Sequence, residues 1–200
     1  MSFAGFAGVA AIVTGIGGFL YSVAFVILAR SAPDTGAFLS ALFLLLGGVL
    51  STAALVGLYR RVHDTDADFA VWALLLGAVA ALGSAAHGGY DLANLLHRPA
   101  ALATDLPSQI DPRGLLTFGV SGLALFLFSW LIARGGRLPR GLGNLGYLSA
   151  VLLVVIYLGR LIVLDPSSPL ILAPAALEGF VVNPVWYVWL GLALRERSAA

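Results

Sequence analysis

The sequence predicts an all-α, polytopic membrane protein built as a six-transmembrane-helix bundle. Hydrophobic residues make up 60% of the 200 residues and charged residues only 10%, whereas charged residues form about a quarter of a soluble domain. The mean hydropathy is +0.98. The apolar residues lie in long blocks and not in amphipathic stripes, so their faces are expected to meet lipid.

Six segments reach the roughly 20 mostly apolar residues that a spanning helix needs. They cover about residues 3–29, 36–59, 69–96, 114–133, 143–164 and 170–194. The first begins without a basic stretch and is far longer than the apolar core of a signal peptide, so we interpret it as a retained helix. A polar connection with Pro99, Pro107 and Pro112 separates the third segment from the fourth. The sequence therefore predicts a single transmembrane domain over residues 1–200.

Arginine positions orient the predicted helices. Every basic residue is arginine, a composition typical of GC-rich bacterial genomes. Seven arginines fall on one predicted side of the membrane: Arg60, Arg61, Arg134, Arg137, Arg140, Arg195 and Arg197. Three fall on the other: Arg30, Arg98 and Arg113. By the positive-inside rule both termini are in the cytoplasm, N-in and C-in, and we expect a multi-pass protein of the bacterial cytoplasmic (inner) membrane.

Small residues are abundant in the predicted helices. The chain has 24 glycines, gathered in stretches such as GVAAIVTG, TGIGG and GLGNLG. Such stretches let helix backbones approach closely, and lipid supplies no hydrophobic drive between helices, so close contacts are needed. We favour packing within one bundle over contact with a second copy or another membrane subunit, which stays the alternative.

One helix face in the third segment carries an unusual run of polar residues. His87, Asp91, Asn94 and Arg98 follow at steps of four, three and four, so they share one face. At 1.5 Å per residue, His87 lies ~27 Å from Phe69 along the axis, in the outer half of the membrane.

Four residues on other helices reach similar predicted depths, counted along each helix: Tyr21, Thr117, Arg160 and Glu178. A buried arginine is far less costly beside a carboxylate than alone. We therefore predict that Arg160 pairs with Asp91, with Glu178 or with both in an outward-facing polar cavity. The alternative is an ion-paired pin that only fixes helix packing.

The cysteine and histidine content of the sequence argues against a metal site. The chain has no cysteine and three histidines. His63 falls on the opposite side of the membrane from His87, and His97 points about 80° away from it at 100° per residue. A metal site usually needs three or more protein ligands. We expect no metal and no cofactor, and assign His87 an orienting hydrogen bond to Asp91.

The sequence also lacks the common signatures of catalysis and of nucleic-acid binding. It has no HExxH, no GxSxG and no phosphate-binding glycine loop. The net charge is +1 and no basic run occurs, which argues against a nucleic acid. We therefore favour a non-catalytic role over an enzyme, which stays open as the third candidate, and expect membrane lipids as the partners.

Two local structures follow from proline and aspartate positions. Pro184 is expected to kink the sixth helix and to free a carbonyl near Phe180. In the loop RRVHDTDAD, Asp66 or Asp68 is expected to cap the N-terminus of the third helix.

The last third of the chain resembles a family of uncharacterised bacterial six-helix membrane proteins, known as a domain of unknown function. The stretches GGRLPRGLGNLGYLSAVLLV and LEGFVVNPVWYVWLGLAL carry the likeness. The matching positions are Arg137, Pro139, Arg140, Gly146, Glu178, Trp189, Leu190 and Gly191. The resemblance implies a six-helix topology and no particular activity.

Three functions stay open from the sequence. The first is a non-catalytic membrane protein, such as a sensor or accessory subunit, that binds a small or amphiphilic ligand in the outward-facing pocket. The second is a small secondary transporter or proton-coupled carrier that uses His87, Asp91, Arg160 and Glu178. The third is an intramembrane enzyme that modifies lipid.

Overall fold

The computed structural model describes residues 2–97, 114–163 and 168–196, and these form six helical segments long and apolar enough to span a membrane. They are Phe3–Ser31, Pro33–Val62, Ala67–Leu96, Leu115–Gly135, Arg140–Ile162 and Pro169–Arg195. The described part contains no strand. The predicted all-α, six-helix class is therefore confirmed, with most helix ends within three residues of the predicted ones. Expectations for Arg98, Pro99, Pro107, Pro112, Arg113, Leu164 and Arg197 concern positions outside the described residues.

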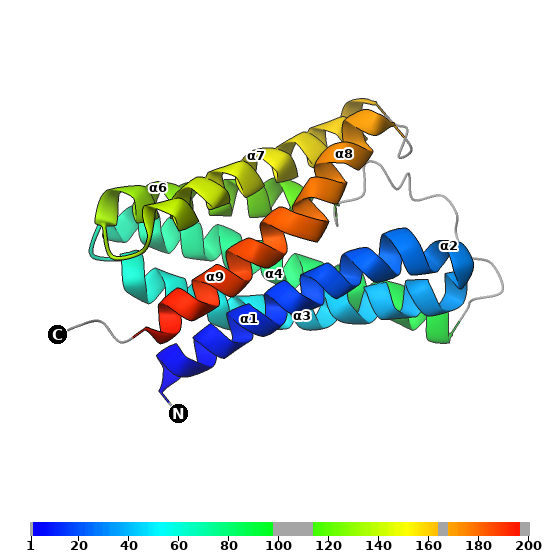
Figure 1. Cartoon of the computed structure of the whole chain (residues 1–200), viewed down its shortest axis with the longest axis horizontal. Coiled ribbons are helices and arrows are strands. Elements are labelled where there is room, and N and C mark those ends of the chain that lie inside the picture. Colours follow the sequence, from blue (N-terminus) through cyan, green and yellow to red (C-terminus); the bar gives the residue numbers. More distant parts are fainter. Residues whose placement is uncertain (1, 98–113, 164–167, 197–200) are drawn as a thin grey trace.

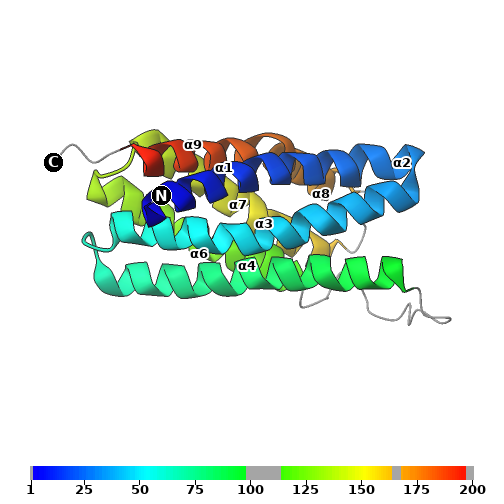
Figure 2. The same cartoon turned by 90° about the horizontal axis from the view of Figure 1, so that it is seen from below.

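Each helix packs against the next one along the chain, and the last returns to the first. The elements are α1 (Phe3–Ser22), α2 (Ala29–Ser31), α3 (Pro33–Val62), α4 (Ala67–Leu96), α6 (Ser121–Gly135), α7 (Arg140–Ile162), α8 (Pro169–Leu177) and α9 (Asn183–Arg195). Contacts run from α1 through α3, α4, α6 and α7 to α8, while α9 packs along α1 (Figures 1 and 2). The helices thus close a ring around a shared core.

The two ends of the bundle differ in charge. α1 begins and α9 ends at one end, together with the turns that join α3 to α4 and α6 to α7 (Figures 1 and 2). This end, called the inner end below, carries Arg60, Arg61, Arg134, Arg137, Arg140 and Arg195. The positive-inside rule predicts that it faces the cytoplasm. The opposite end is called the outer end.

Glycine lets neighbouring helices pack backbone against backbone. A Cβ on Gly48 of α3 would lie 2.5 Å from the Ala85 nitrogen of α4, and one on Gly88 of α4 would lie 2.5 Å from the Ala41 oxygen of α3. Between α1 and α9, a Cβ on Gly15 would lie 2.8 Å from the Pro184 oxygen. The prediction that small residues pack within one bundle is thus confirmed for these helix pairs.

Three of the six helices change to π-helical geometry part-way along their length. The segments are η1 (Val23–Leu28), η2 (Leu115–Val120) and η3 (Glu178–Val182). The third lies between Pro174, inside α8, and Pro184, in the first turn of α9. Pro184 has no N–H for the carbonyl of Phe180. The chain responds with a π segment in which the Asn183 N–H reaches back five residues to the Glu178 carbonyl. The sequence predicted a disruption at Pro184 but gave no sign of η1 or η2.

The N-terminal cap of α4 follows the sequence prediction. The Asp66 carboxylate accepts a hydrogen bond from the Phe69 N–H at 3.2 Å, so Asp66 and not Asp68 is the capping residue. Asp68 lies in the first turn of the same helix, where a negative charge also stabilises the helix dipole.

Candidate functional site

The polar face of α4 connects to two other helices near the outer end. His87 and Asp91 lie one turn apart on α4, with 3.4 Å between His87 Nε2 and Asp91 Oδ2. The other ring nitrogen, His87 Nδ1, lies 3.5 Å from the Thr117 hydroxyl in η2. His87 thus holds the Asp91 carboxylate on one side and η2 on the other, which confirms Asp91 as its predicted partner.

Arg160 of α7 belongs to the same polar layer near the outer end as His87, Asp91 and Thr117. It lies in the last turn of that helix, where the helix dipole stabilises a positive charge. Its guanidinium is 5.7 Å from the centre of the Phe118 ring, a cation–π contact. The charges of Arg160 and Asp91 both act on Tyr21 of α1. Tyr21 therefore belongs to this layer, while a direct Arg160–Asp91 ion pair stays a prediction.

Glu178 belongs to a different layer, which corrects the predicted grouping. Its carboxylate accepts a hydrogen bond from the Ser149 hydroxyl of α7 at 2.5 Å. Arg160 lies eleven residues farther along the same regular helix, about 16 Å nearer the outer end at 1.5 Å per residue. Because that separation exceeds the reach of an arginine side chain, Glu178 does not pair with Arg160. The count from the outer end of the sixth span placed Glu178 too close to that end. Its contact with Ser149 places it deeper in the bundle.

An open cavity of about 430 Å³ lies at the outer end between α4 and the first two spans. Its polar wall is formed by Asp91, Asn94 and Ser40. Its other wall is apolar and includes Phe25, Ala29, Ala37 and Leu95. The Asp91 side chain is 42% exposed. Of the predicted site residues, Asp91 and Asn94 line this cavity, whereas His87, Arg160 and Glu178 do not; that the cavity faces outward stays a prediction.

Sequence reasoning missed the residues that complete this cavity. Ser40 and Phe25 come from α3 and from η1, and nothing in their local sequence distinguishes them from neighbouring serines and aromatics. Their position depends on how α1 and α3 pack, because a Cβ on Gly36 would lie 2.9 Å from the Ala24 oxygen. Only this close approach of α3 to η1 brings them opposite Asp91.

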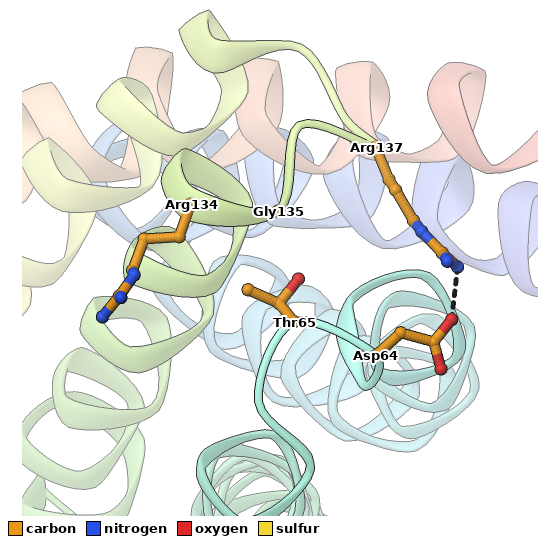
Figure 3. A pocket seen from close by; sticks show the side chains of 5 residues that line it. All are labelled: Asp64, Thr65, Arg134, Gly135 and Arg137. Carbon is orange, nitrogen blue, oxygen red and sulfur yellow. Dashed lines mark ion pairs between the residues drawn. The ribbon is translucent and has the colours of Figure 1, made fainter.

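A second cavity, of about 390 Å³, lies at the inner end and is lined by Asp64, Thr65, Arg134, Gly135 and Arg137 (Figure 3). Figure 3 shows the Arg137 and Arg134 side chains on opposite sides of Thr65.

Ion pairing closes one side of this cavity. The Arg137 guanidinium lies 2.6 Å from the Asp64 carboxylate, which also lies 2.8 Å from His63 Nε2. The pair joins the α3–α4 turn to the α6–α7 turn. The sequence assigned the Asp64 loop only a capping role, because the meeting of two distant turns leaves no local signal.

The described core contains polar atoms without hydrogen-bond partners, and of their residues the sequence analysis singled out only Glu178. Within the described residues, four buried side-chain atoms have no hydrogen-bond partner: Thr14 Oγ1, Ser129 Oγ, Glu178 Oε2 and Trp186 Nε1. Ser129 and Trp186 both approach the α-carbon of Gly146, where a Cβ would be 2.8 Å from the indole nitrogen. These four atoms are polar points in an otherwise mostly apolar core. Among the same described residues no group of three His, Asp or Glu side chains gathers.

No protein-family model matches the chain, and no curated protein or solved structure shows significant similarity to it. The resemblance to the six-helix family of unknown function therefore stays a prediction.

Proposed function

We propose that this chain is a non-catalytic membrane protein, a sensor or an accessory subunit, that binds a small amphiphilic ligand with a cationic head in the outer-end cavity. The observation that supports this is the composition of the cavity, which sets the exposed Asp91 carboxylate and the Asn94 amide opposite an apolar wall with Phe25. Ligand sites commonly combine a mostly apolar lining with a few polar groups that fix orientation.

The charge of the ligand follows from Asp91. His87 lies on its far side at 3.4 Å and holds the carboxylate in place. A carboxylate can only accept hydrogen bonds, so it favours a head group that donates them, and a positive charge roughly doubles the strength of such a bond. Asn94 and Ser40 add groups that can both donate and accept.

A fluorescent lipophilic cation tests this proposal. Ethidium binding to the purified protein in detergent is measured by fluorescence anisotropy. Replacing Asp91 with Asn removes a charge-assisted hydrogen bond worth about 1.5–3 kcal/mol. We therefore expect ethidium to bind on the order of 10–100-fold more weakly to Asp91→Asn than to the unmodified protein.

Asp34→Asn is the matched control, since Asp34 is an exposed carboxylate in the first turn of α3 that does not line the cavity. It should bind ethidium like the unmodified chain. Equal affinities of the Asp91 and Asp34 variants contradict the proposal. Anilinonaphthalene sulfonate, an anionic amphiphile, should not lose affinity in Asp91→Asn.

A small secondary transporter or proton-coupled carrier is the second candidate. The π-helical breaks in three helices favour it, because carriers often place discontinuous helices around a site near the middle of the membrane. Ethidium accumulation in proteoliposomes under an imposed proton gradient measures this activity. Accumulation that disappears with the gradient supports the carrier, and binding without accumulation supports the sensor or subunit.

A further inference from the structure

Glu178 is an acidic side chain enclosed in the apolar interior of the bundle. The residue is only 4% exposed, and its hydrogen-bonding neighbour Ser149 is 1% exposed. Ser149 lies about 13 Å from the inner end of α7 and about 20 Å from its outer end, so the pair is near the middle of that span. Glu178 is thus far from either water-facing end.

The hydrogen bonds of the carboxylate are incomplete. Oε1 accepts from the Ser149 hydroxyl, and the Asn183 side chain also interacts with the carboxylate. Within the described residues, Oε2 has no hydrogen-bond partner. A negative charge on this carboxylate would be compensated only by the Ser149 and Asn183 side chains among the described residues.

Among the described residues, no positive side chain pairs with Glu178. Tyr187 of α9 is close enough to feel the Glu178 carboxylate, and its hydroxyl interacts with Ser51 of α3. On α1, Ser22 borders Gly179 and donates its hydroxyl to the Gly18 carbonyl. On α7, Arg160 lies about 16 Å nearer the outer end. The chain contains no lysine, and no ion pair among the described residues involves Glu178.

We propose that Glu178 and Ser149 form a binding site for a small cation, a proton or a sodium ion, in the middle of the bundle. An unpaired carboxylate in a hydrocarbon layer is strongly unfavourable, and a bound cation neutralises it. A proton on Oε2 leaves Oε1 free to accept from Ser149. A sodium ion instead binds carboxylate and amide oxygens, the ligands that hard cations prefer, which Glu178 and Asn183 supply.

A helix break begins at Glu178 itself. η3 begins at Glu178 and lies between Pro174 and Pro184, so the backbone there differs from a regular helix. Single-turn π segments are frequent at functional sites. The site is separate from the outer cavity, so it does not depend on the proposed ligand. If the chain is a carrier, this site supplies the coupling ion.

Dicyclohexylcarbodiimide tests the site by covalent labelling. This hydrophobic reagent adds to a protonated carboxyl group in apolar surroundings and leaves a stable acylurea on it. After treatment of the detergent-solubilised protein in sodium-free buffer, peptide mass spectrometry should find the adduct on Glu178. The Glu178→Gln variant should lose that adduct completely. Glu196→Gln, which alters an exposed carboxylate after α9, should keep it.

The response of the label distinguishes the two cations. Labelling that rises as the pH falls and ignores sodium assigns a proton site. Labelling that sodium chloride blocks and choline chloride leaves unchanged assigns a sodium site. Both results support the proposal, and Ser149→Ala should change the pH or sodium dependence in either case.

Infrared spectroscopy makes the test independent of reagent access. The carboxylic-acid C=O stretch of Glu178 is identified as the band that Glu178→Gln removes. A proton site shows this band in sodium chloride and in choline chloride. A sodium site shows it only in choline chloride, where sodium is absent. Absence of a Glu178 acid band in both salts, together with absence of labelling, overturns the proposal. Failure of ethidium binding at Asp91 leaves this result unaffected.

Discussion

Adjacent glycines in α3 provide a direct test of how the bundle is held together. Gly48 faces α4, and a Cβ placed on it would lie 2.5 Å from the Ala85 nitrogen and 2.6 Å from the Ala81 oxygen. Gly47, one residue earlier, has no described atom within 4 Å of the same hypothetical Cβ. We predict that Gly48→Ala destabilises the protein and that Gly47→Ala does not.

The magnitude follows from the geometry of the contact. Ordinary van der Waals contact begins at 3.4 Å, so the new methyl group is about 0.9 Å too close to backbone atoms that cannot rotate away. Forcing an extra methyl group into a packed interior typically costs about 1–3 kcal/mol. Both substitutions gain roughly the same 1 kcal/mol of helix propensity. Gly48→Ala should therefore be about 1–3 kcal/mol less stable than Gly47→Ala.

The free energy of unfolding is measured by titrating the detergent-solubilised variants with sodium dodecyl sulfate and following helix content by circular dichroism. Gly47→Ala should be as stable as the unmodified protein or up to about 1 kcal/mol more stable. Gly88→Ala places a methyl group 2.5 Å from the Ala41 oxygen in the same contact between α3 and α4, so its loss of stability should resemble that of Gly48→Ala. Equal stability of the Gly47 and Gly48 variants would refute the close approach of α3 and α4.

Two further substitutions address the inner end. Asp66→Ala removes the hydrogen bond to the Phe69 N–H and should lower the free energy of unfolding by about 1 kcal/mol. Asp68→Ala should lower it less, and a larger loss for Asp68→Ala in the same sodium dodecyl sulfate titration contradicts Asp66 as the cap. Arg137→Gln breaks the ion pair with Asp64, whose two side chains are 55% and 46% exposed, so the free energy of unfolding should change by less than about 1 kcal/mol, and by less still in high salt. A loss of several kcal/mol contradicts the interpretation of this contact as a weak surface ion pair.

Much of the fold could be predicted because its signals are local. Block hydropathy predicts six spans, and Asp66 before an apolar run predicts a helix start, since both depend on contiguous residues. The polar face of α4 is also local, because steps of three and four place His87, Asp91 and Asn94 together on any regular helix. These predictions needed no knowledge of neighbouring helices.

The candidate site was predicted only in part. Depth counted along the helices placed Arg160, Asp91 and Thr117 toward the same end of the bundle, and the structure has them there. The same count failed for Glu178, because α8 starts beyond the layer in which its carboxylate meets Ser149. Helix tilt and axial offset are set by packing and are absent from a residue count.

The sequence alone thus determined that the chain is a bundle of six apolar helices with most of its arginines toward one end. It also determined which polar residues share a helix face. Only the tertiary structure decided that Asp91 and Asn94 line a cavity with Phe25, and that Glu178 is enclosed with Ser149 about 16 Å from Arg160. The physical reason is that partition into lipid depends on the composition of each segment, whereas a site depends on contacts between helices. Those contacts are set by glycine seams and π-helical breaks that bring distant residues to the same depth.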